Sequence, residues 1–138
     1  MVNNLGHFVN GEHLTDSGDL IEIYNPSNGE LISTISNASI KTINKTLDSS
    51  LDAFNEWKNY SIAKRSSILF DYKVLLEKNI DKLSDIISKD LGKVKEDAIG
   101  EVRRGIENVE YACGVGEILK GEFNKNISTS VDSWSEFS

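Results

Sequence analysis

The chain has 138 residues, of which 15 are basic and 22 are acidic, so its formal net charge is −7. This balance argues against nucleic acid and anionic membranes as partners, because both bind proteins through a basic face. No apolar run is long enough to cross a membrane, the N-terminus does not form a secretory signal, and a single cysteine excludes an internal disulfide. The composition indicates an acidic cytoplasmic protein of one domain.

Residues 1–36 are predicted to form short strands joined by turns. Asn10-Gly11 lies between apolar residues, and this dipeptide supplies the two positive φ angles of a type I′ hairpin turn. Further along, Leu20–Tyr24 and Leu31–Ser36 have the residue types and the alternation of strands, with a proline-glycine turn between them. The pattern predicts the strands and leaves open the order in which they pair.

Residues 39–121 are predicted to be helical, because the spacing of apolar residues changes from two to about 3.6. Ser39 and Ser61 are suited to cap the first two helices, since a serine hydroxyl accepts a hydrogen bond from a first-turn amide. The sequence does not decide whether Asn79 divides the second helical segment, which ends at Gly92. The apolar stripe of the first helix consists of Ile40, Ile43, Leu47, Leu51, Phe54 and Trp57.

A third helical segment runs from about Val94 to Leu119 and contains several glycines, which indicate close packing against another backbone. Residues 128–138 are rich in serine, threonine, valine and aromatic residues and are predicted to begin a β-arm. Because the pattern offers no partner strand for this segment, we expect an exposed, poorly anchored strand that favours self-association. The predicted fold class is α/β, with N-terminal β-hairpin strands, three to four amphipathic helices and a terminal strand.

Cys113 is the only thiol, and it lies late in the apolar stripe of the third helical segment, with Glu110 and Glu117 nearby. Reactive thiols lie at electropositive, partly exposed places, so Cys113 is predicted to be a buried structural residue and not a nucleophile. His7 and His13 flank the hairpin turn and could face each other across it. Two histidines without further ligands do not complete a zinc site, so no metal role is assigned to them.

The run GVGEILKG, residues 114–121, has some likeness to a dinucleotide-binding fingerprint. Leu119 stands where the motif needs its third glycine, and the segment before the run is predicted to be a helix instead of a strand. No catalytic or cofactor-binding residue is therefore assigned in this chain. Glu101 lies next to an apolar helix stripe, and a solvated position at the edge of that stripe is the favoured interpretation.

Several stretches, in this order, resemble the N-terminal part of the aldehyde dehydrogenase superfamily. They are HFVNGE from His7, IYNPSNGELIS from Ile23, AFNEW from Ala53, NIDKLSDIISKDLGK ending at Lys93, and the Gly100-Glu101 pair. NIDKL and RGIENVEYAC, the latter spanning Arg104 to Cys113, are most similar to the CoA-acylating branch, methylmalonate-semialdehyde dehydrogenase. The resemblance implies that residues 1–138 are a single partial domain, formed by the outer strands and helices in the first part of a cofactor domain.

For the complete enzyme, the resemblance implies an NAD-dependent oxidoreductase that forms a homo-oligomer. In the family a cysteine thiolate attacks the aldehyde and hydride passes to NAD. In the acylating branch coenzyme A then takes the acyl group, so that methylmalonate semialdehyde gives propionyl-CoA with loss of the carboxylate carbon. The family's catalytic cysteine, general base and nucleotide-binding segments lie beyond the positions that this chain matches. The chain alone, as a fragment or a truncated product, is therefore expected to bind no cofactor and to be inactive.

Some family members place an acid at the position of Glu101, near the strand that precedes the Asn-Pro turn. By this resemblance, the Glu101 carboxylate and the carbonyls of Ile23 and Tyr24 are a candidate site for a weakly bound monovalent cation or for water. Two alternatives to the acylating enzyme stay open. One is a segment of an aldehyde dehydrogenase that hydrolyses its thioester with water, and the other is a stand-alone helical interaction module.

Overall fold

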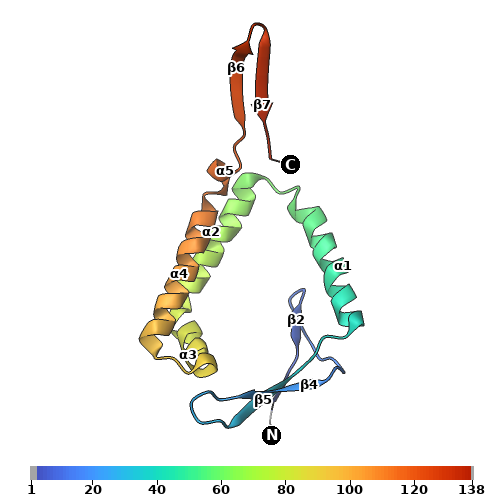
Figure 1. The fold of residues 1–138 in the computed structure, drawn as a ribbon, viewed down its shortest axis with the longest axis vertical. Coiled ribbons are helices and arrows are strands. Elements are labelled where there is room, and N and C mark those ends of the chain that lie inside the picture. The colour runs from blue at the N-terminus through green and yellow to red at the C-terminus, as the bar shows by residue number, and fades with distance from the viewer. Residues whose placement is uncertain (1–2, 138) are drawn as a thin grey trace. The chain divides into compact units, whose positions relative to one another are not determined.

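The computed structural model describes residues 3–137, which form a mixed α/β fold of short strands and helices (Figure 1). The chain divides into two compact units, residues 1–60 with 84–98 and residues 61–83 with 99–138. The predicted class, with strands first, then helices, then a terminal strand, is confirmed.

Three strands of the first unit form a sheet in the order β1 (Asn3–Leu5), β5 (Leu31–Ser36), β4 (Leu20–Tyr24). β4 pairs with β5 antiparallel, whereas β1 pairs with β5 in parallel. On the central strand, the Ser36 hydroxyl is buried and lies 3.3 and 3.4 Å from the side-chain nitrogen and oxygen of Asn4. The sequence does not predict β1, because three residues, NNL, are too short to show an alternation.

The predicted type I′ hairpin is confirmed. β2 (His7–Val9) and β3 (Glu12–Leu14) pair antiparallel and form a two-stranded sheet of their own. Asn10 and Gly11 have φ angles of 52° and 79°, the left-handed values that this turn requires of both residues.

Both predicted serine caps are confirmed. α1 (Ile40–Trp57) begins after Ser39, whose hydroxyl accepts a hydrogen bond from the Thr42 N–H at 3.3 Å. α2 (Ile62–Lys78) is capped in the same way by Ser61, which accepts from a first-turn N–H at 3.2 Å. Each cap satisfies a backbone donor that has no partner within its helix.

Asn79 divides the second helical segment, a point that the sequence left open. It ends α2, and α3 (Ile80–Leu91) follows at once. Gly92 ends α3 with a φ of 70°, which fits the predicted stop. A Cβ added at Gly92 would lie 3.1 Å from Cγ of Pro26. The glycine therefore also lets the turn between β4 and β5 approach the end of α3 closely.

The third helical segment consists of α4 (Lys95–Cys113) and the short α5 (Val115–Ile118). In the second unit α4 lies beside α2 (Figure 1), and Lys73 of α2 forms an ion pair with Glu110 of α4 at 3.4 Å. Among the described residues, the buried apolar side chains all lie on α4, where they are at most 9% exposed. They are Ala98, Val102, Ile106 and Cys113.

The prediction of an unpaired terminal strand is wrong. β7 (Val131–Ser135) pairs antiparallel with β6 (Glu122–Ser128), and together they form a hairpin. The helical region ends at Ile118, earlier than predicted, and this leaves the following residues free to form the partner strand. Asn126, with a φ of 55°, lies in an irregular stretch of β6 that obscures the alternation. Ser138, the last residue of the predicted arm, lies outside the described residues.

Candidate functional site

Cys113 is buried at the C-terminal end of α4, with 5% of its surface exposed, as predicted. Its backbone carbonyl accepts a hydrogen bond from the Ser66 hydroxyl at 2.5 Å, which ties the end of α4 to the first turns of α2. A thiol enclosed in this way packs as a small apolar side chain. That it has no catalytic role stays a prediction.

His7 and His13 do not face each other. The register of the hairpin pairs His7 with Leu14 and His13 with Phe8. The rings of His13 and Phe8 contact edge to face with their centroids 5.1 Å apart. Within residues 3–137, no group of three or more histidine, cysteine, aspartate or glutamate side chains is arranged to hold a metal ion.

Within the GVGEILKG run, Gly116 lies at a helix contact. Gly116 lies in α5, and a Cβ at this position would meet Cγ2 of Ile62 at 3.2 Å. The run therefore brings α5 against the start of α2 instead of curving around a phosphate as a strand-to-helix loop does. That this run binds no nicotinamide nucleotide stays a prediction.

The three residues of the candidate cation site lie on two elements. Ile23 and Tyr24 end strand β4 in the first unit, and Glu101 lies on α4 in the second. The side chain of Glu101 is 35% exposed and lies 4.0 Å from the guanidinium of Arg104, one turn further along the helix. The cation site stays a prediction.

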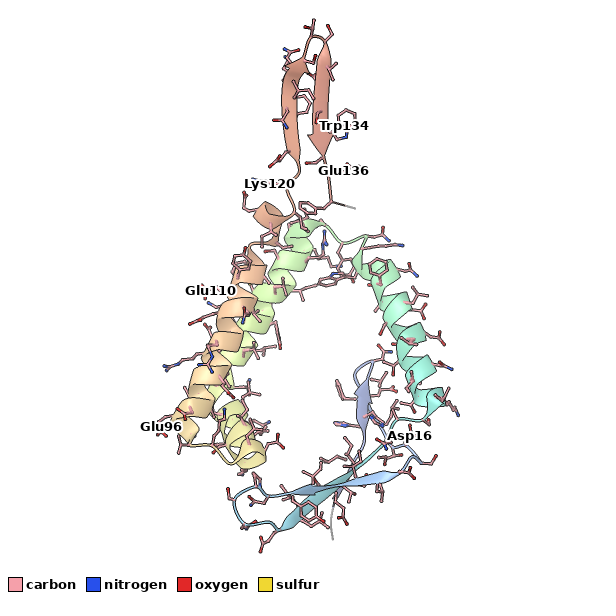
Figure 2. The ribbon with its side chains drawn as sticks, viewed as in Figure 1. Asp16, Glu96, Glu110, Lys120, Trp134 and Glu136 are labelled. Atoms are coloured by element: carbon pink, nitrogen blue, oxygen red, sulfur yellow. The ribbon has the colours of Figure 1, made fainter. Side chains whose placement is uncertain are left out.

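Asp16 holds the N-terminus of α1 and was not singled out from the sequence. One carboxylate oxygen accepts from the Ser39 N–H at 2.7 Å, and the other accepts from the Ser17 N–H at 2.7 Å (Figure 2). Hydrogen bonding from Thr42 and from the Ser39 backbone holds the pKa of Asp16 well below its usual range. An anionic group at a helix N-terminus also interacts favourably with the helix dipole.

A groove of about 490 Å³ lies between β2 and the first half of α1. Apolar side chains form most of its wall, and two threonines of α1 contribute hydroxyls. The α1 residues Ile43 and Leu47, which are 42% and 62% exposed, belong to the predicted apolar stripe. The lining residues are Gly6, His7, Phe8, Val9, Ala38, Thr42, Ile43, Thr46 and Leu47.

The β6–β7 hairpin presents apolar side chains to the exterior. Phe123 and Trp134 are 65% and 71% exposed and face each other in the register, and Trp134 projects from the hairpin (Figure 2). A Cβ at Gly121 would overlap the backbone oxygen of Ser135, so the two chain segments meet backbone to backbone at the base of the hairpin.

The family model named "Aldehyde dehydrogenase family" matches residues 13–136, which is nearly the whole chain. This chain belongs to the aldehyde dehydrogenase family. The superfamily resemblance inferred from the sequence motifs is therefore confirmed.

Two curated relatives show which aldehyde dehydrogenases this chain is similar to. It is 47% identical to a malonate-semialdehyde dehydrogenase of Pseudomonas aeruginosa, over 96% of this chain and 27% of that protein. It is 33% identical to a probable acylating methylmalonate-semialdehyde/malonate-semialdehyde dehydrogenase of Dictyostelium discoideum, described as mitochondrial, over 98% of this chain and 26% of that protein. The chain thus spans about a quarter of the length of these relatives.

Solved aldehyde dehydrogenase structures contain the same fold. The methylmalonate-semialdehyde dehydrogenase of Oceanimonas doudoroffii matches 99% of this chain with 40% identity and a TM-score of 0.92, which is 28% of that structure. A putative methylmalonate-semialdehyde dehydrogenase of Sinorhizobium meliloti, solved in complex with NAD, matches 99% of this chain with 29% identity and a TM-score of 0.91. The arrangement of strands and helices described above is therefore that of the N-terminal part of this family of enzymes.

None of the helices within residues 3–137 of this aldehyde dehydrogenase chain is both long and apolar enough to cross a membrane.

Proposed function

We propose that this chain is the N-terminal part of an NAD-dependent, CoA-acylating dehydrogenase that acts on methylmalonate semialdehyde or malonate semialdehyde. The supporting observation is the 47% identity to a malonate-semialdehyde dehydrogenase over 96% of the chain. The match to a methylmalonate-semialdehyde dehydrogenase structure with a TM-score of 0.92 adds weight to it. The word "acylating" in the name of the Dictyostelium relative favours coenzyme A over water as the acyl acceptor.

In this proposal the chain contributes scaffold and no catalytic group. Cys113, its only thiol, is 5% exposed at the end of α4, and its backbone carbonyl accepts a hydrogen bond from the Ser66 hydroxyl. The one glycine-rich run with a likeness to a nucleotide-binding loop is occupied in packing α5 on α2. The two compact units of the chain are then parts of a single domain, which further segments of the enzyme complete.

The complete enzyme is proposed to be a cytoplasmic homo-oligomer. Its β6–β7 hairpin supports this, because two strands alone are marginal in water and an exposed edge is suited to pairing with another chain. Phe123 and Trp134 would add apolar contact to such pairing, since both are more than half exposed. Light scattering on the complete enzyme, compared with a Trp134→Ser variant, tests this part.

The test of the activity uses the complete reading frame that contains this sequence. The purified product is expected to reduce NAD with methylmalonate semialdehyde or malonate semialdehyde, and to form a CoA thioester when coenzyme A is present. Propanal serves as a control substrate without the carboxylate. NAD reduction that yields a free acid with or without coenzyme A would favour the hydrolytic alternative. Absence of aldehyde oxidation would favour the stand-alone interaction module.

A further inference from the structure

The first unit contains two Asn-Gly dipeptides in exposed turns, and they differ in the hydrogen bonds of the asparagine side chain and of the glycine nitrogen. Asn10-Gly11 forms the tip of the β2–β3 hairpin, and Asn28-Gly29 lies in the turn between β4 and β5. Asparagine followed by glycine is the sequence most prone to spontaneous deamidation, because glycine has no side chain to hinder attack by its nitrogen. The two sites thus have the same intrinsic chemistry in different surroundings.

The side chain of Asn28 is held at both of its polar atoms. Its Nδ2 donates to a carboxylate oxygen of Glu30 at 2.9 Å, and its Oδ1 accepts from the Glu30 N–H at 3.0 Å. The attacking nitrogen of this site, that of Gly29, donates to the Asn25 carbonyl at 2.8 Å. Both reacting groups must therefore break hydrogen bonds before they can approach each other.

The side chain of Asn10 is exposed and makes no hydrogen bond to any described residue, and neither does the Gly11 N–H. A Cβ added at Gly11 would meet nothing within 4 Å, so water reaches this turn from its open side. The hairpin has three residues in each strand, and within residues 3–137 no third strand pairs with it. Such a two-stranded hairpin opens at low cost, which frees the backbone of Asn10 to rotate toward its side chain.

We propose that Asn10 is a site of non-enzymatic deamidation and isomerisation in this protein, and that Asn28 is protected. The Gly11 nitrogen attacks Cγ of Asn10 and forms a C–N bond, the Cγ–Nδ2 bond breaks, and ammonia leaves with the proton from the Gly11 nitrogen. The product is a five-membered succinimide. Water then opens either of its two carbonyls, giving aspartate or isoaspartate at position 10, and nothing is oxidised or reduced.

The modification changes the hairpin in two ways. Either product places a new negative charge in the turn, two residues before Glu12, the first residue of β3. Isoaspartate also adds a methylene to the backbone, which the two-residue turn does not accommodate. Both effects weaken the pairing of β2, whose residues line the groove against α1.

The test is peptide mapping by mass spectrometry during incubation, at mildly alkaline pH, of the folded product of the complete reading frame that contains this chain. The deamidation rate of Asn10 is compared with that of Asn28 in the same sample. A second sample, unfolded in concentrated guanidinium, gives the rate of each site when the chain has no folded structure. In the folded chain we expect Asn10 to convert at least roughly tenfold faster than Asn28, since the protected site must break several hydrogen bonds. In guanidinium the two rates should converge.

Two variants test whether Asn10 is the reactive residue and whether Glu30 protects Asn28. Asn10→Gln should abolish conversion at position 10, because glutamine forms the larger ring slowly. Glu30→Ala should accelerate conversion of Asn28 and leave the rate at Asn10 unchanged. Equal rates at the two sites in the folded chain, faster conversion of Asn28, or no conversion at Asn10 when the unfolded sample reacts would each overturn the proposal.

Discussion

Helices α1 and α4 have nearly the same length, 18 and 19 residues, and both carry apolar side chains along one side. On α4 that side is covered, with Ala98 and Ile106 only 0% and 8% exposed. On α1 it is not, since Leu47 and Leu51 are 62% and 60% exposed. Apolar spacing therefore shows which side of a helix is suited to packing, and it leaves open whether anything within the same chain packs there.

The two helices are also anchored by different means. α4 is held along its length, through the Lys73–Glu110 ion pair and the Ser66 hydroxyl that donates to its C-terminal carbonyl. α1 is anchored at its N-terminus, where Ser39 and Asp16 accept hydrogen bonds from the backbone N–H groups of Thr42 and Ser39. The stability of the isolated chain should therefore respond to substitutions on α4 more strongly than to substitutions on α1.

The largest effect is expected from Ile106→Ala on the covered side of α4. Removing the buried side chain leaves a cavity, and the free energy of unfolding should fall by about 2–5 kcal/mol. Urea denaturation followed by circular dichroism measures this change. Ile106→Val is the matched control and should cost only about 0.5–1.5 kcal/mol. A loss of less than about 0.5 kcal/mol for the alanine variant would show that this side of α4 is not a core.

A pair of glycine substitutions compares a closed position with an open one. Gly121→Ala should destabilise the chain by about 1–3 kcal/mol, because its Cβ would overlap the Ser135 carbonyl at the base of the hairpin. Gly105→Ala, in the middle of α4, should stabilise it by about 0.5–1 kcal/mol, because a Cβ there meets nothing within 4 Å. Thermal unfolding of both variants measures the two changes. If both substitutions raised the stability, or both lowered it, the distinction between a closed and an open glycine position would be wrong.

These features differ in how far the sequence predicts them. The Asn10-Gly11 turn and the caps Ser39 and Ser61 depend on neighbouring residues, and local spacing predicts them correctly. The parallel pairing of β1 with β5 joins segments about 30 residues apart, so no local signal specifies it. The partner strand of β7 was missed because Asn126 interrupts the alternation of β6.

Cys113 and Asp16 differ in the same way: the first could be predicted from neighbouring residues and the second could not. The burial of Cys113 could be predicted from its place in the apolar stripe of α4. The role of Asp16 could not, because the nitrogen of Ser39 that it binds lies 23 residues further along the chain. An aspartate in a turn-rich segment is a weak signal by itself, and only the fold places it against the start of a helix.

Asp16→Asn tests the N-terminal anchor of α1. The folded-state pKa of Asp16 lies below its unfolded value of about 3.9, so its stabilising effect is present above that pH and is lost as the pH falls toward the folded pKa. The variant should be less stable than the parent at neutral pH, and the difference should shrink below about pH 4. Thermal unfolding measured at neutral and acidic pH gives both values. If the parent and the variant differed in stability by the same amount at neutral and acidic pH, the charge of Asp16 would not be what stabilises the start of α1.

The smallest effect is expected from Leu47→Ala on the exposed side of α1. The side chain is already 62% exposed, so its removal should change the free energy of unfolding by no more than about 0.5 kcal/mol. The comparison with Ile106→Ala is direct, since both remove a branched aliphatic side chain from the apolar side of a long helix. Repeating the measurement at several protein concentrations separates folding from association. If Leu47→Ala lowered the free energy of unfolding by about 2 kcal/mol, and more at higher protein concentration, a second copy of the chain would cover the apolar side of α1. The difference in burial between α1 and α4 would then apply only to the single chain.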